Sequence, residues 1–128
     1  MQVRAVDFIG IPVKDIPSSQ AFYGETLGLT PSGSFGETWA EYDAGGTTLA
    51  LIKVDAETID AAHSGGPYGT TGVALAVPDV AAAVEELRGK GVPIAFETAE
   101  YPPCFMAVVQ DPSGNWLFLH QRKDGTAG

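Results

Sequence analysis

Residues 111–120, DPSGNWLFLH, decide the fold of this chain. The first five are residue types that favour tight turns. The last five alternate two leucines with Trp116, Phe118 and His120, which is the period of a β-strand. Residues two apart share one face of a strand, so we expect these three side chains to face a pocket while the leucines pack under helices.

The same pattern occurs once before in the chain. The turn Asp43-Ala44-Gly45-Gly46, which precedes an alternating run over residues 47–52, lies 68 residues (111 minus 43) before the turn that opens at Asp111. Asp15 and Asp79 are related by a similar offset of 64 (79 minus 15), and each follows an apolar, strand-like run. An aspartate in this place is suited to cap the N-terminus of a helix. The sequence therefore contains two copies of a strand-helix-strands unit.

Periodicity gives the expected elements of both copies. Helical stripes of apolar residues cover 16–27 and 80–90, and a glycine that can end a helix follows each of them, Gly28 and Gly91. The first strand, residues 6–13, is apolar enough to be buried on both faces. The remaining expected elements are two or three antiparallel strands between 32 and 54, one helical turn in 55–63, and strands near 72–77, 94–96, 104–109 and 116–121.

Composition excludes several classes of partner. The net charge is -9 and the seven Lys and Arg are scattered, so binding to nucleic acid or to anionic membrane surfaces is not expected. No apolar run approaches the roughly 20 residues of a membrane span. The single cysteine, Cys104, cannot form an internal disulfide and is expected to be a small buried hydrophobe. We expect a cytoplasmic protein.

Four short motifs, in this order, carry a family resemblance. They are Phe22-Tyr23 followed by Leu27-Gly28-Leu29, then Val77-Pro78-Asp79-Val80, and finally residues 111–115. With the internal duplication they resemble the vicinal oxygen chelate superfamily, which includes glyoxalase I, extradiol dioxygenases and bleomycin-resistance proteins. The resemblance implies an α+β fold of paired βαβββ modules whose curved mixed sheets enclose a cleft, commonly completed across a homodimer. We accordingly expect one domain over 1–128, with repeats at about 3–55 and 70–122 linked by 56–69.

The resemblance also implies where a metal would be held. Enzymes of this superfamily typically bind a divalent cation through His and Glu side chains on four strands. The matching positions here are Phe8, Ala50, Gly72 and Phe118. None has a side-chain oxygen or nitrogen, which such a cation requires. We therefore predict neither a metal nor another cofactor.

The same parity argument describes a pocket lined by apolar and aromatic groups. Such a pocket suits a flat or bulky apolar molecule. The predicted function is metal-independent binding or sequestration of a small apolar or aromatic compound, as in the bleomycin-resistance branch, with antibiotic resistance as its expected purpose. Phe8 and Phe118 are equally compatible with an ordinary core. The predicted ligand-binding residues are Phe8, Trp39, Ala50, Tyr68, Gly72, Trp116 and Phe118.

Two enzymatic alternatives stay open. One is a lyase or isomerase that acts without metal on a small carbonyl substrate, with Glu41 or His120 as acid or base. The other is a metal enzyme whose ligands lie elsewhere. Against catalysis, the favoured interpretation of Glu41 is an exposed edge-strand charge and that of His120 is a surface histidine. His63 is expected to be a solvated loop residue.

Overall fold

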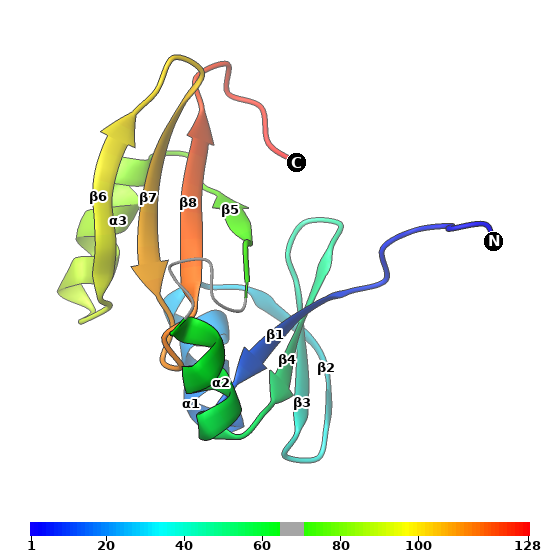
Figure 1. Cartoon of the computed structure of the whole chain (residues 1–128). Coiled ribbons are helices and arrows are strands. Elements are labelled where there is room, and N and C mark those ends of the chain that lie inside the picture. Colours follow the sequence, from blue (N-terminus) through cyan, green and yellow to red (C-terminus); the bar gives the residue numbers. More distant parts are fainter. Residues whose placement is uncertain (65–70) are drawn as a thin grey trace. The chain divides into compact units, whose positions relative to one another are not determined.

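The computed structural model describes residues 1–64 and 71–128, and the chain separates into two compact units, Met1–Asp60 and Ala61–Gly128 (Figure 1). Each unit contains a four-stranded mixed sheet, which confirms the predicted α+β class. The elements are β1 Ile9–Val13, α1 Ile16–Gln20, η1 Ala21–Thr26, β2 Thr30–Phe35, β3 Trp39–Asp43, β4 Thr48–Lys53, α2 Ala56–His63, β5 Ala74–Ala76, α3 Val80–Gly89, β6 Ile94–Glu100, β7 Cys104–Gln110 and β8 Trp116–Arg122.

The two sheets have the same topology. Their strand orders are β1-β4-β3-β2 and β5-β8-β7-β6, so in each unit the first strand lies beside the fourth. That pair is parallel and the other neighbours are antiparallel. The helix between the first and second strands makes the parallel pairing possible, because parallel strands need a crossover connection. The predicted repeat of a βαβββ module is confirmed.

Aspartate caps start the crossover helices, as predicted. Asp15 accepts a hydrogen bond from the backbone N–H of Ser18 at 2.9 Å, and Asp79 accepts one from Ala82 at 3.0 Å. The first helix covers the expected residues, but its second half, η1, is a π-helix. Gly28 follows this helix with a φ of 78°, a conformation that glycine adopts without strain.

The core of each unit lies between its sheet and its crossover helix. In the first unit Ile11, Leu51 and Tyr23 are each 0% exposed. In the second unit Leu117 is 0% exposed and Leu119 is 2% exposed, which agrees with the predicted parity of that strand. Among the described helices none is long and apolar enough to cross a membrane.

The prediction that residues 6–13 form a strand buried on both faces was wrong. The strand begins at Ile9, and Phe8 and Ile9 are 44% and 38% exposed. The physical reason is that β1 is an edge strand of its sheet, so an apolar run there is not enclosed on all sides. Cys104 is free and 9% exposed, in agreement with its interpretation as a buried hydrophobe.

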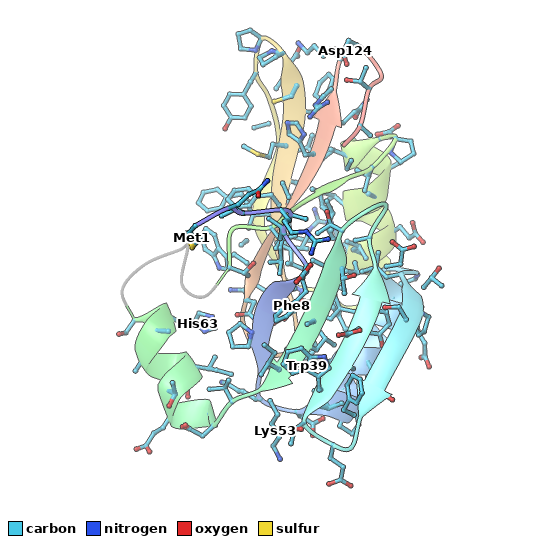
Figure 2. The ribbon with its side chains drawn as sticks, turned by 90° about the vertical axis from the view of Figure 1, so that its right-hand side faces the viewer. Met1, Phe8, Trp39, Lys53, His63 and Asp124 are labelled. Atoms are coloured by element: carbon cyan, nitrogen blue, oxygen red, sulfur yellow. The ribbon has the colours of Figure 1, made fainter. Side chains whose placement is uncertain are left out.

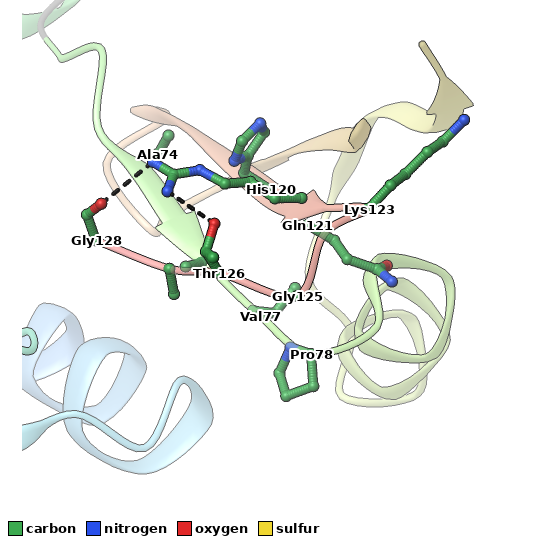
Figure 3. A pocket seen from close by; sticks show the side chains of 12 residues that line it. Ala74, Val77, Pro78, His120, Gln121, Lys123, Gly125, Thr126 and Gly128 are labelled. Carbon is green, nitrogen blue, oxygen red and sulfur yellow. Dashed lines mark hydrogen bonds between the residues drawn. The ribbon is translucent and has the colours of Figure 1, made fainter. Parts of the chain in front are cut away.

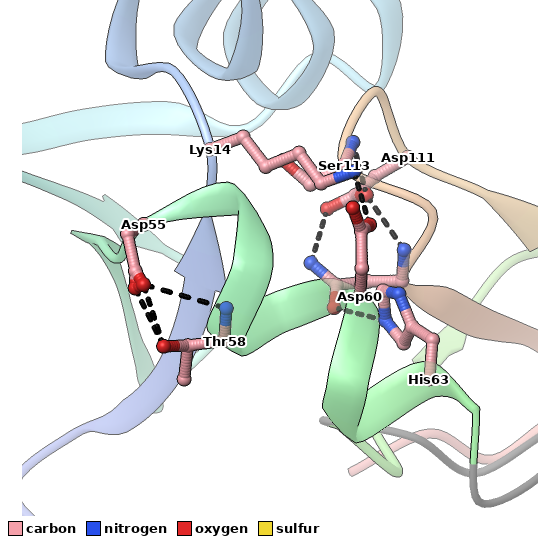
Figure 4. Close-up of polar contacts among 8 residues, drawn as sticks. Lys14, Asp55, Thr58, Asp60, His63, Asp111 and Ser113 are labelled. Carbon is pink, nitrogen blue, oxygen red and sulfur yellow. Dashed lines mark hydrogen bonds and ion pairs between the residues drawn. The ribbon is translucent and has the colours of Figure 1, made fainter.

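The segment expected to hold one helical turn forms the eight-residue helix α2. Asp55, just before it, accepts a hydrogen bond from the Thr58 hydroxyl at 2.6 Å. Ile59 is 1% exposed, and Lys14 forms an ion pair with Asp60 at 2.6 Å (Figure 4). Capping, one buried apolar residue and the ion pair together stabilise a helix that periodicity alone did not reveal.

Candidate ligand-binding surfaces

Each sheet has a face that points away from its crossover helix. In the first unit Tyr42 marks the helix side, because its hydroxyl donates to the carbonyl of Gln20 at 3.3 Å. Neighbouring residues of β3 point the opposite way, so Trp39 and Glu41 belong to the other face. We call this the far face of the first unit; strand registers place on it Phe8, Gly10, Gly33, Phe35, Trp39, Glu41, Asp43, Thr48, Ala50 and Ile52.

On this face Trp39 contacts both Phe8 and Glu41. Figure 2 labels Phe8 and Trp39. The rings of Phe8 and Trp39 meet edge to face, with centroids 5.3 Å apart and planes at 82°. The indole Nε1–H of Trp39 donates to Oε1 of Glu41 at 3.0 Å. The structure therefore brings together two predicted ligand-binding residues, Phe8 and Trp39, with Glu41, a candidate acid or base.

Glycines shape the surface beside this group. A Cβ added to Gly33 would lie 3.4 Å from Oε2 of Glu41, and one added to Gly10 would lie 3.0 Å from Cδ1 of Ile52. Side chains at these positions would crowd the carboxylate and Ile52. Ala50 pairs with Gly10 and Glu41 in the sheet and is 0% exposed, so its role in ligand binding stays a prediction.

The far face of the second unit carries Trp116, Phe118 and His120, all half-buried. Trp116 makes an edge-to-face contact with Phe96, with centroids 5.3 Å apart and planes at 72°. Phe96 is 58% exposed, and the sequence analysis did not predict it as a ligand-binding residue. The pairing of β6 with β7 is irregular on both sides of Phe96, so simple alternation of side chains does not predict which face of the sheet Phe96 lies on.

An open pocket of about 750 Å³ lies at the β5 edge of this unit (Figure 3). Ala74, Ala76 and His120 line it from the sheet, and residues 125–128 line it from the C-terminal segment. Arg122 holds that segment, donating to Oγ1 of Thr126 and to the carbonyl of Gly128 at 3.2 Å each. His120 therefore lines this pocket, but Trp116 and Phe118 are not among the described residues that line it, so the predicted pocket of these three side chains stays a prediction.

Two aspartates owe their shifted pKa to turn and cap hydrogen bonds. The backbone N–H of Ser18 lowers the pKa of Asp15, and the backbone N–H of Thr126 lowers the pKa of Asp124. Both donors lie within three residues of their acceptor, an arrangement typical of caps and turns. These carboxylates have structural roles, as was predicted for Asp15.

The four positions expected to hold a metal have the same arrangement in both units. Phe8 lies two residues before Gly10, which pairs with Ala50, and Gly72 lies two residues before Ala74, which pairs with Phe118. None of these four residues has a side-chain oxygen or nitrogen that could bind a metal ion. Within residues 1–64 and 71–128, no group of three or more His, Cys, Asp or Glu side chains is arranged to hold a metal ion. The residues present do not fit the superfamily's metal.

His63 was wrongly predicted to be a solvated loop residue. It ends α2 and is half-buried, with its Nε2 3.2 Å from Oδ1 of Asn115 (Figure 4). The Asn115 amide donates in turn to Asp111 at 2.9 Å. Gly114 has a φ of 85°, which favours glycine, and a Cβ added there would lie 3.5 Å from the imidazole ring of His63, an ordinary contact distance.

The predicted roles of Gly72 and Tyr68 in ligand binding are not tested by the structure. Gly72 is exposed, and within the described part of the chain a Cβ added there would meet no atom within 4 Å. Tyr68 lies outside the described residues. Both stay predictions.

Comparison with known proteins identifies the class. Residues 5–119 match the model of the Glyoxalase/Bleomycin resistance protein/Dioxygenase superfamily, and the chain belongs to this superfamily. The predicted family and fold are thereby confirmed. No curated protein sequence matches the chain.

Several solved structures are similar to this chain over most of its length. The chain is similar to UcmS2, at 30% identity with a TM-score of 0.75, over 94% of this chain and 98% of that one. It is also similar to TnmS3, an antibiotic binding protein from Streptomyces sp. CB03234, at 25% identity with a TM-score of 0.71, over 96% and 99% of the two chains. Lactoylglutathione lyase from Agrobacterium tumefaciens shares the fold at 16% identity with a TM-score of 0.68, over 94% and 95%.

Proposed function

We propose that the protein binds and sequesters a small apolar or aromatic compound without a metal ion, and that its biological role is resistance to an antibiotic. The observation that carries the proposal is the presence of an edge-to-face Phe–Trp pair on the far face of each sheet. A buried aromatic side chain contributes roughly 150–250 Å² of contact area, and favourable ring geometry adds about 0.5–1.5 kcal/mol. Similarity to an antibiotic binding protein supports the same conclusion.

Exposure of the aromatic groups supports ligand binding over an ordinary core. Phe8 is 44% exposed and Phe96 is 58% exposed, whereas the core residues of both sheets are almost completely buried. Large exposed aromatics rimmed by polar groups are typical of binding sites. We expect the protein to act as a homodimer in the cytoplasm.

The test is a titration with N-phenyl-1-naphthylamine, an uncharged probe whose emission rises in apolar sites. Trp39→Leu and Trp116→Leu each remove a ring from one pair, and we expect each to weaken binding about tenfold, the upper part of the range for one aromatic contact. Tyr101→Leu is the matched control, since Tyr101 is 46% exposed and lies outside both pairs. It should change the dissociation constant less than twofold.

Metal dependence is tested in the same titration. Protein dialysed against EDTA should bind the probe with unchanged affinity. A wild-type protein with no saturable binding would refute the proposal, and so would binding that EDTA removes and zinc or magnesium restores.

One observation favours a metal-free enzyme as the second candidate. His120 lines the pocket of the second unit, where an imidazole is able to move a proton on a bound carbonyl compound. Incubating the protein with small α-keto and hemithioacetal compounds, with His120→Ala as control, would detect turnover. Conversion that disappears in His120→Ala would favour catalysis over sequestration.

A further inference from the structure

We infer that the far face of the first unit recognises a cationic group, so that the ligand is an aromatic compound carrying a protonated amine; this inference rests on the proposed function. The feature that carries it is the contact of Phe8, Trp39 and Glu41. The Glu41 carboxylate contacts the Trp39 indole, and that indole in turn contacts the Phe8 ring. Ammonium groups are attracted by carboxylates and by the faces of aromatic rings, and the two attractions act together.

The orientation of Glu41 leaves one of its oxygens available. Oε1 accepts from the Trp39 indole at 3.0 Å, which fixes the carboxylate against the ring. Oε2 lies over Gly33, which has no side chain to cover it. Because the carboxylate is held in place before a ligand arrives, binding a cation costs little ordering of this side chain.

The charged side chains on the described strands of this far face are acidic. The strand positions of this far face carry two carboxylates, Glu41 and Asp43, and within the described strands no Lys, Arg or His side chain shares the face. Glu41 accepts its hydrogen bond from the indole N–H of Trp39, which is uncharged, so this contact does not neutralise the carboxylate. The net charge of -9 adds a long-range attraction for cations.

The far face of the second unit differs in this respect. His120 and Arg122 lie on it beside Trp116 and Phe118, and no acidic residue of β8 accompanies them. The two aromatic pairs are therefore not equivalent in charge. In the described part of the chain, the pair of the first unit contacts a carboxylate directly, through the hydrogen bond from Trp39 to Glu41.

The test compares two flat probes of nearly equal shape at pH 8: 9-aminoacridine, which is a cation, and acridine, which is uncharged. Wild-type protein should bind the cation about tenfold more tightly, as expected for one charge pair at a partly exposed site. Glu41→Gln should abolish this preference and leave acridine binding within twofold. Glutamine keeps the carbonyl that accepts from Trp39, so the variant removes the charge without removing the hydrogen bond.

Glu57→Gln is the matched control. Glu57 is an exposed residue in the first turn of α2, in the same unit, and its substitution removes the same charge from elsewhere. The preference should survive in this variant within twofold. Equal loss in both variants would overturn the inference, because the preference would then come from the general field of an acidic protein.

Failure of the inference and failure of the proposed function give different results. If wild-type protein binds both acridines equally well, the cation site is refuted and sequestration of apolar compounds stands. If it binds neither these probes nor N-phenyl-1-naphthylamine, the proposed function itself is refuted and the cation site with it.

Discussion

Replacing Asp111 by alanine should destabilise the protein far more than the same change at Asp43, its counterpart in the other repeat. Both carboxylates hold a turn before the last strand of a module. The Asp43 carboxylate accepts from Gly45 at 3.1 Å, and the Asp111 carboxylate accepts from Ser113 at 2.8 Å. The difference between them is burial, because Asp43 is exposed whereas Asp111 is only 4% exposed.

The size of the effect follows from the groups that lose their acceptor. Asp111 also accepts from the backbone and the side chain of Asn115, at 2.9 Å each. Ser113 and Asn115 are 3% and 0% exposed, so water cannot replace the carboxylate at these donors. An unsatisfied buried donor costs about 1–3 kcal/mol, and two backbone donors give about 4 kcal/mol. Asp43→Ala leaves an exposed donor that water can satisfy, at a cost of about 0.5–1 kcal/mol.

The free energy of unfolding is measured by urea titration, followed by far-UV circular dichroism. Asp111→Ala should lower it by about 4 kcal/mol and Asp43→Ala by no more than about 1 kcal/mol. A second effect is expected because Asn115 also contacts His63: the end of α2 should exchange amide hydrogens faster in Asp111→Ala. Equal losses in the two variants would refute the argument that burial determines the cost.

Two further predictions concern the first unit. Leu51 is 0% exposed on the helix side of β4, so Leu51→Ala should lower the free energy of unfolding by about 2–5 kcal/mol. Ile52 lies on the far face, and Ile52→Ala should lower it by about 1 kcal/mol. A urea titration that ranks the two variants the other way would contradict the faces assigned to these residues. Burial, with a smaller effect from the negative charge of Glu25, raises the pKa of Tyr42 above its ordinary value of 10.0. The unfolded chain therefore loses this proton first, so stability should fall as the pH rises above about 10 in wild-type protein and less steeply in Tyr42→Phe.

Much of the fold was predictable because local chemistry and tertiary structure agree. Asp15 and Asp79 cap helices through their own neighbours, and Gly28 adopts the left-handed conformation that ends a helix. These are interactions within a few residues, which a sequence displays directly. The helix α2 was underestimated because its stability depends on distant partners, such as Lys14 for Asp60.

For the candidate site, the alternation of side chains along each strand predicted which face of the sheet a residue lies on, and no more. Alternation placed Trp116 and Phe118 on the face opposite the buried leucines, and the structure agrees. Alternation does not predict which side chains of different strands meet. The contact of Phe8 with Trp39 depends on β1 and β3 lying on either side of β4, and the contact of Phe96 with Trp116 depends on the irregular pairing of β6.

The internal duplication explains why the two far faces differ while the two cores do not. Leu49 and Leu51 correspond at an offset of 68 to Leu117 and Leu119, and all four are nearly completely buried against the helix side. A core tolerates few changes of volume, because each cavity or clash costs stability.

The far faces are subject to that packing requirement only in part, because Ala50 is 0% exposed whereas Ile52, Phe118 and His120 are half-buried. At the same offset Ala50 corresponds to Phe118 and Ile52 to His120. At half-buried positions such as Ile52 and His120, a change of side chain needs little repacking of the core, so the chemistry there can diverge between repeats at little cost to the fold. Glu41 and Asp43 on the far face of the first unit, and His120 and Arg122 on the far face of the second unit, are differences of this kind, so the two repeats share the packing of their cores and differ in the chemistry of their far faces.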